Sequence, residues 1–138
     1  MHQAAVRRAG TDLTLVSYSR MANLSVQAAA TLAKENINAE VIDLRSLSPI
    51  DWDTCAASLH KTHRLLVVEE DCRFAGVGAE IIATLNERCF YDLDAAPARV
   101  AAVDMPTPFN GELEAASIPT VSDIVKAGRQ LAGRGKPV

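Results

Sequence analysis

Short runs of aliphatic and β-branched residues alternate along the chain with segments in which apolar residues recur every three or four positions. The runs predict strands at residues 13–18, 39–44, 65–69 and 98–103. The run at 65–69 is almost wholly apolar, which is typical of a central parallel strand buried on both faces. Residues 3–8 form a weaker candidate that suits an edge strand.

The segments between these runs have the spacing of amphipathic helices. One follows Tyr18 with Ser19 as its N-cap, and a second opens at Ser48 and Pro49. A third carries Val77, Ile81 and Leu85 on one face, and the last begins at a capping box of Thr120 and Asp123. Strands that alternate with helices predict an α/β fold, a parallel sheet with helices on both faces.

The 138 residues suit one domain, which we place at residues 1–132 with a flexible tail at 133–138. Residues 104–119 depart from the alternation, because they contain prolines and a glycine and show no periodicity. Phe109 and Leu113 would be unusual on a free loop of this length. We therefore expect this segment to cover a surface or to lie at a subunit interface.

Charge and composition exclude several partners. The net charge is −3 and no basic stripe is present, which argues against nucleic acid. No apolar run approaches the ~20 residues of a membrane span. Cys55, Cys72 and Cys89 form no zinc pattern and no disulfide framework, so we expect reduced thiols in a cytoplasmic protein.

One group of residues suggests a ligand site. Glu69, Glu70 and Asp71 close a predicted central strand, and Gly76 and Gly78 open the next helix. Open α/β sheets bind ligands at the carboxyl ends of their strands, and helix N-termini bind anions. The candidate site is a crevice formed by Ser19, Glu70, Gly76 and Gly78.

Structural interpretations of the same residues are open. The glycines suit a tight turn that lets a helix pack on the sheet, and one carboxylate can pair locally with Arg73 or Arg45. His60 and His63 could place two metal ligands on one helix face, but the sequence offers no third. No catalytic, cofactor-binding or metal-binding residue is assigned.

Several segments together resemble the transketolase C-terminal domain family, in the form found in the β subunit of 2-oxo acid dehydrogenases. The resemblance runs from about Ala4 to Leu131. Each segment is weakly specific alone, but their order is strongly so. They are residues 11–18, 40–51, 67–70, 76–81, 104–109 and 117–121.

This resemblance implies a three-layer α/β/α sandwich around a five-stranded, mostly parallel mixed sheet, with the first strand antiparallel at the edge. It implies no cofactor in this domain and no activity for the chain alone. The full enzyme that it implies uses thiamine diphosphate and Mg²⁺ to decarboxylate a 2-oxo acid and acylate lipoyl groups. We expect the pyruvate type, although the residues do not distinguish pyruvate from branched-chain substrates or acetoin.

The resemblance also implies partners. These are an α subunit and a second β subunit in a heterotetramer, and a dihydrolipoyl acyltransferase. Asp92 and Asp94 would belong to the acidic surface that docks the acyltransferase, or to a solvated turn. The isolated chain could form a homodimer through its uncovered interface. The alternative function is a stand-alone α/β module that binds a small ligand or anion in the crevice.

Overall fold

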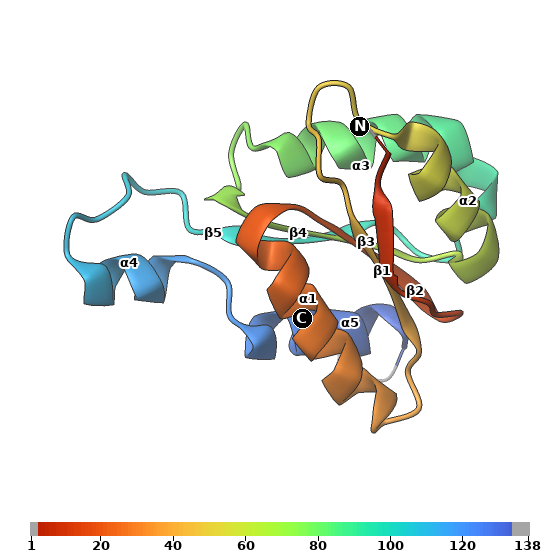
Figure 1. Ribbon diagram of the computed structural model, residues 1–138, viewed down its shortest axis with the longest axis horizontal. Coiled ribbons are helices and arrows are strands. Elements are labelled where there is room, and N and C mark those ends of the chain that lie inside the picture. Colours follow the sequence, from red (N-terminus) through yellow and green to blue (C-terminus); the bar gives the residue numbers. More distant parts are fainter. Residues whose placement is uncertain (1–2, 134–138) are drawn as a thin grey trace.

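The computed structural model describes residues 3–133, which form a five-stranded sheet between two layers of helices (Figure 1). The strand order is β1-β3-β2-β4-β5. β1 is antiparallel to β3, and all other neighbouring strands are parallel. The predicted α/β/α sandwich with an antiparallel edge strand is therefore confirmed. The strands are β1 (Ala5–Arg8), β2 (Leu13–Ser17), β3 (Ala39–Asp43), β4 (Leu65–Cys72) and β5 (Ala98–Ala102).

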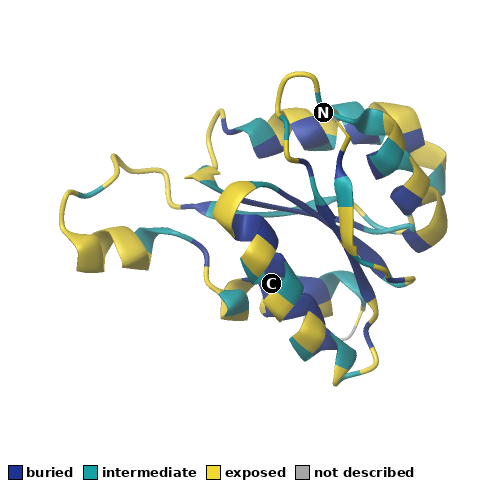
Figure 2. Cartoon of the chain, in the orientation of Figure 1, coloured by how far each residue is buried: buried dark blue, intermediate teal, exposed yellow. Residues whose placement is uncertain are grey.

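Four of the helices cover the sheet, two on each face. α1 (Ser19–Ala33) and α5 (Val121–Leu131) cover one face, and α2 (Trp52–Thr62) and α3 (Val77–Cys89) cover the other. Side chains of β4 alternate between the two layers, with Leu66 and Val68 in the first core and Leu65 and Val67 in the second. The central strands are buried on both faces, as their apolar runs predict (Figure 2).

Two helix starts differ from the sequence-based expectation. Ser19 is not an N-cap, because Tyr18 occupies that position without a side-chain cap and Ser19 is already helical. α2 begins at Trp52 rather than at Ser48 and Pro49, which are joined by a cis peptide bond. The N-cap of α2 is Asp51, whose carboxylate accepts a hydrogen bond from the Thr54 N–H at 3.1 Å.

The capping box of α5 is confirmed. The Thr120 hydroxyl accepts from the Asp123 N–H, and the Asp123 carboxylate accepts from the Thr120 N–H at 2.9 Å. The Thr120 hydroxyl, which also donates to the Asp123 carboxylate at 2.7 Å, and the Thr120 N–H hold the pKa of Asp123 below its ordinary value. The glycine at position 128 lets α5 lie close to α1. A Cβ at this position would come within 2.8 Å of Leu32 Cδ1.

The segment predicted to lack periodicity contains a helix, α4 (Gly111–Ser117). Asn110 caps it by accepting from the N–H groups of Glu112 and Leu113 at 2.9 and 3.4 Å. A short 3₁₀ turn, η1 (Phe90–Asp92), also follows α3. Beyond residue 133, the predicted tail lies outside the described residues.

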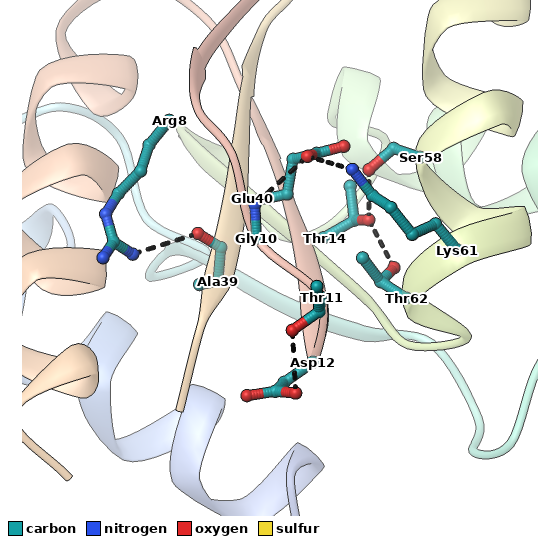
Figure 3. Close-up of polar contacts among 10 residues, drawn as sticks. All are labelled: Arg8, Gly10, Thr11, Asp12, Thr14, Ala39, Glu40, Ser58, Lys61 and Thr62. Atoms are coloured by element: carbon teal, nitrogen blue, oxygen red, sulfur yellow. Dashed lines mark hydrogen bonds and ion pairs between the residues drawn. The ribbon is translucent and has the colours of Figure 1, made fainter. Parts of the chain in front are cut away.

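A polar cluster fastens α2 to the sheet near the amino ends of the parallel strands (Figure 3). The Thr14 hydroxyl lies 2.6 Å from the hydroxyls of both Ser58 and Thr62. The buried Glu40 carboxylate accepts from Lys61 Nζ at 2.5 Å and from the Gly10 N–H at 3.2 Å. These contacts satisfy polar groups that burial would otherwise leave without partners.

Replacing Lys61 by methionine should destabilise the fold near neutral pH and have a smaller effect in acid. Burial raises the pKa of Glu40, but hydrogen bonds from Lys61, Ser58 and Gly10 outweigh it and leave the pKa below its ordinary value of 4.5. The stabilisation is therefore complete above pH 4.5 and is lost as the pH falls through the folded pKa. Lys61 is half exposed, so we expect Lys61→Met to cost only about 1 kcal/mol near neutral pH.

Urea denaturation near neutral pH and at about pH 4 measures this effect. The difference between wild type and Lys61→Met should shrink at the lower pH. Lys34→Met, at an exposed lysine outside the cluster, should leave stability unchanged at both values. An equal loss at both pH values would contradict the assignment to Glu40.

Candidate functional site

The topology creates a switch point at the carboxyl ends of β2 and β4. β2 pairs with β3 on one side and with β4 on the other, so the connections after these strands diverge. Ligands of open α/β sheets bind at such points. Tyr18 and Ser19 leave the end of β2 here, and Glu69 and Glu70 lie opposite them in β4.

The centre of this edge is a buried carboxylate, that of Glu69. Its Oε2 accepts from the Gly78 N–H at 2.7 Å and from the Tyr18 hydroxyl at 3.3 Å. Arg99 Nε lies 3.5 Å from Oε1, so β5 supplies the cation. Burial, reinforced by Glu69, raises the pKa of Tyr18, which keeps the phenol neutral as a donor.

The two glycines make room for this carboxylate. A Cβ at Gly78 would lie 2.3 Å from Glu69 Oε1, and one at Gly76 would lie 2.4 Å from the Cys72 carbonyl oxygen. Gly78 lies in the first turn of α3, where free N–H groups and the helix dipole favour negative charge. Glu69 therefore serves as an internal anion at the start of this helix.

The Glu69 carboxylate occupies the glycine side of the predicted crevice. Gly76 and Gly78 face Glu69, and the partner of Glu69 is Arg99 rather than Arg73 or Arg45. An external anion would have to displace a buried carboxylate from the Gly78 N–H. The anion-binding alternative stays a prediction, and this geometry argues against it.

The remaining crevice residues, Ser19 and Glu70, lie together. The Ser19 hydroxyl donates to Glu70 Oε1 at 3.4 Å, a long hydrogen bond. Glu70 also lines a cavity of about 140 Å³ between the ends of β4 and β5 and helix α4. Asp71, Glu114 and Arg20 provide the other charges of its wall.

The charges and size of this cavity do not suit thiamine diphosphate with Mg²⁺. Glu70, Asp71 and Glu114 could coordinate Mg²⁺ but would repel the diphosphate, and Arg20 is the one cation of the lining. A volume of about 140 Å³ is also below the usual range of small-molecule sites. The residues of this edge therefore do not form a site for that cofactor.

Asp92 and Asp94, the predicted docking residues, lie on the connection between α3 and β5 and pair with basic residues near the end of α2. Asp92 lies 2.9 Å from the His60 ring, and Asp94 lies 3.7 Å from the Arg64 guanidinium. His63 Nδ1 lies 2.8 Å from the Asp92 carbonyl oxygen. Two exposed aromatic residues, Phe90 and Tyr91, precede them and line a surface hollow of about 580 Å³ with Asp94.

The connection from β5 to α5 projects from the sandwich and carries α4 at its far end (Figure 1). Its base is fixed to the domain, because the Asp104 carboxylate accepts from the Phe74 N–H at 2.7 Å. Its outer part exposes Met105, Phe109 and Leu113, and Phe109 is fully accessible. Exposed apolar clusters of this kind mark interaction surfaces.

The fold and this edge define an α/β sandwich domain whose usual ligand edge is closed by its own carboxylate. A family model described as "Transketolase, C-terminal domain" matches residues 2–124. The chain belongs to this family, as its sequence motifs predict.

Several curated relatives share this domain. A pyruvate dehydrogenase E1 component subunit beta from Porphyra purpurea is 41% identical over 138 residues, which are 100% of this chain and 42% of that protein. The mitochondrial subunits from Pisum sativum and Drosophila melanogaster are 43% and 47% identical over 99% and 95% of the chain. The chain spans 38% and 36% of these two relatives.

Solved structures agree on the fold. A chain described as "Split gene transketolase, inactive beta4 tetramer" superposes with a TM-score of 0.77 at 26% identity, over 98% of this chain and 43% of that one. A 2-oxoglutarate:ferredoxin oxidoreductase from Magnetococcus marinus superposes with a TM-score of 0.61 at 12% identity, over 94% of this chain and 19% of that one. Among residues 3–133, no helix is long and apolar enough to span a membrane.

Proposed function

We propose that this chain is the C-terminal assembly and docking domain of the β subunit of a thiamine-diphosphate-dependent 2-oxo acid dehydrogenase of the pyruvate type. One observation carries the proposal. Relatives named as pyruvate dehydrogenase β subunits match 91–100% of this chain at 41–47% identity, yet the matched region is only 36–42% of their length. The matched region is one domain of a larger catalytic subunit.

The proposed role of the domain is to hold subunits together. Glu69 occupies the start of α3, and the cavity beside Glu70 is small and mostly acidic. The projecting segment, by contrast, offers exposed apolar side chains to another surface. We assign that surface to the α subunit and the second β subunit of a heterotetramer.

The rest of the proposal follows the resemblance. Thiamine diphosphate and Mg²⁺ are held by other parts of the enzyme, and the acyltransferase docks at Asp92 and Asp94. Docking of a basic partner would exchange the contacts that these carboxylates make with His60 and Arg64. We place the enzyme in the cytoplasm, and the three unpaired cysteines support a reducing compartment.

The purified chain should neither bind thiamine diphosphate nor decarboxylate pyruvate, because the residues that it contributes to its ligand edge do not fit the cofactor. Isothermal titration with thiamine diphosphate and Mg²⁺ measures the first expectation, and carbon dioxide release from pyruvate measures the second. Turnover by the chain alone would overturn the proposal.

The same preparation should self-associate, since the projecting segment has no covering partner. The split transketolase whose β chains form an inactive tetramer supports this expectation for a related domain. Homodimer formation is therefore part of the proposal. Analytical sedimentation of the purified chain should detect a species heavier than the monomer.

A further inference from the structure

A second group of side chains lies away from the switch point, at the ends of α2 and α3. One ring nitrogen of His60, the Cys89 sulfur and a carboxylate oxygen of Asp92 lie within 4.8 Å of one another. His60 comes from the last turn of α2, Cys89 ends α3, and Asp92 closes η1. The sequence shows His60 beside His63, but only the fold brings Cys89 and Asp92 to it.

The backbone around this group is held in place by independent hydrogen bonds. His63 Nδ1 lies 2.8 Å from the Asp92 carbonyl oxygen, and the Asp94 N–H donates to the His63 carbonyl oxygen at 2.9 Å. These two contacts join η1 and the residues after it to the end of α2. The turn that carries Asp92 is therefore fixed relative to His60 before any ligand binds.

The three ligand side chains differ in how far they are exposed to solvent. The Cys89 side chain is buried, Asp92 is partly exposed, and the His60 side chain is 56% exposed. The exposed His60 side chain therefore places the group at the protein surface, with the sulfur as its inner member. Solvent at this surface leaves room for a water ligand.

The three ligand atoms, all within 4.8 Å of one another, lie near the spacing that a tetrahedral ion needs, and small side-chain shifts would complete it. Bond lengths of about 2.0–2.3 Å at tetrahedral angles place ligand atoms about 3.3–3.5 Å apart. His60 Nδ1 and Asp92 Oδ2 are now 2.9 Å apart, so they would have to separate by only a few tenths of an ångström. The exposed His60 ring can make this adjustment by rotating its side chain.

We propose that His60, Cys89 and Asp92 bind one divalent transition-metal ion, with water in the fourth coordination position. The metal that we infer from the chemistry of these ligands is Zn²⁺. A mixed sulfur, nitrogen and oxygen set favours Zn²⁺ over Mg²⁺ or Ca²⁺, which prefer oxygen alone. When the metal–sulfur bond forms, the thiol proton leaves to solvent. This site does not rest on the proposed function, but a metal ion on Asp92 would compete with the docking of a basic partner at that carboxylate.

Titration of the full 138-residue chain with Co²⁺, followed by displacement with Zn²⁺, tests the site. A single equivalent of Co²⁺ should produce a thiolate-to-cobalt charge-transfer band, and Zn²⁺ should abolish it. Because the loss of a supporting residue alone weakens metal sites by about 10–100-fold, Cys89→Ser and His60→Gln should each reduce affinity at least about 10-fold. Cys89→Ser should also remove the band.

Matched variants keep the outcome interpretable. Cys72→Ser, the same substitution at a cysteine outside the group, should retain both band and affinity. If Cys89→Ser fails to fold, His60→Gln and Asp92→Asn test the site at more exposed positions. Absence of a one-equivalent transition in the wild type, or a band that survives Cys89→Ser, would overturn the proposal.

Discussion

Alanine at position 78 should destabilise the domain by about 3 kcal/mol. The added Cβ would lie 2.3 Å from Glu69 Oε1 and 2.9 Å from Arg99 Cδ, closer than real contacts allow. Either α3 moves away from the sheet, or the Glu69 carboxylate loses the Gly78 N–H that holds it. Both outcomes leave a buried charge with fewer partners. Urea denaturation of Gly78→Ala against wild type measures the loss.

Gly111 provides the matched control for this substitution. A Cβ at this position meets nothing within 4 Å, and the residue is the first of α4. Gly111→Ala should therefore leave stability within about 1 kcal/mol of wild type, with any change favourable. If Gly78→Ala behaved like Gly111→Ala, Glu69 would not be held at the start of α3 as described.

Serine at Phe109 or Leu113 should disrupt subunit assembly by about 30-fold or more without lowering the stability of the chain. Both side chains are exposed in the free domain, so truncation removes no internal packing. Apolar anchors at the centre of an interface commonly contribute 2 kcal/mol or more, which is about 30-fold in affinity. The fold itself should melt at the same temperature.

A hybrid subunit measures this effect. In it, this chain replaces the matching 136 residues of the Pisum sativum relative, and the product is coexpressed with the α subunit of that enzyme. Phe109→Ser and Leu113→Ser should shift the hybrid to smaller species in sedimentation. Tyr91→Ser, at an equally exposed aromatic residue on the connection after α3, should leave assembly unchanged. If Phe109→Ser and Leu113→Ser both assembled as well as the wild-type hybrid, the projecting segment would not be the interface.

Local patterns predicted the strands and the faces of the helices, because both depend on residues close together in the sequence. The apolar run at residues 65–68 in β4 and the Thr120–Asp123 box belong to this class. The start of α2 was wrong, since Pro49 fits the first turn of a helix as well as the cis bond that precedes one. Helix α4 was missed, although Asn110 followed by Gly111 and Glu112 is a usable N-cap signal.

The sites depended on tertiary contacts that no spacing reveals. Glu69 was one of three adjacent acidic residues, and only the fold shows that it is buried and that its cation, Arg99, comes from β5. A glutamate at the end of an apolar strand, followed by Gly76 and Gly78 at a helix start, is the signal that could have identified it. The approach of Cys89 to His60 had no comparable signal.

The central claim is that this chain is the assembly part of a pyruvate dehydrogenase β subunit. The most direct test is the activity of the wild-type hybrid with its α subunit. We expect a heterotetramer that decarboxylates pyruvate with added thiamine diphosphate, while the same preparation lacking this chain does not assemble. A folded hybrid that stays apart from the α subunit and shows no turnover would contradict the claim.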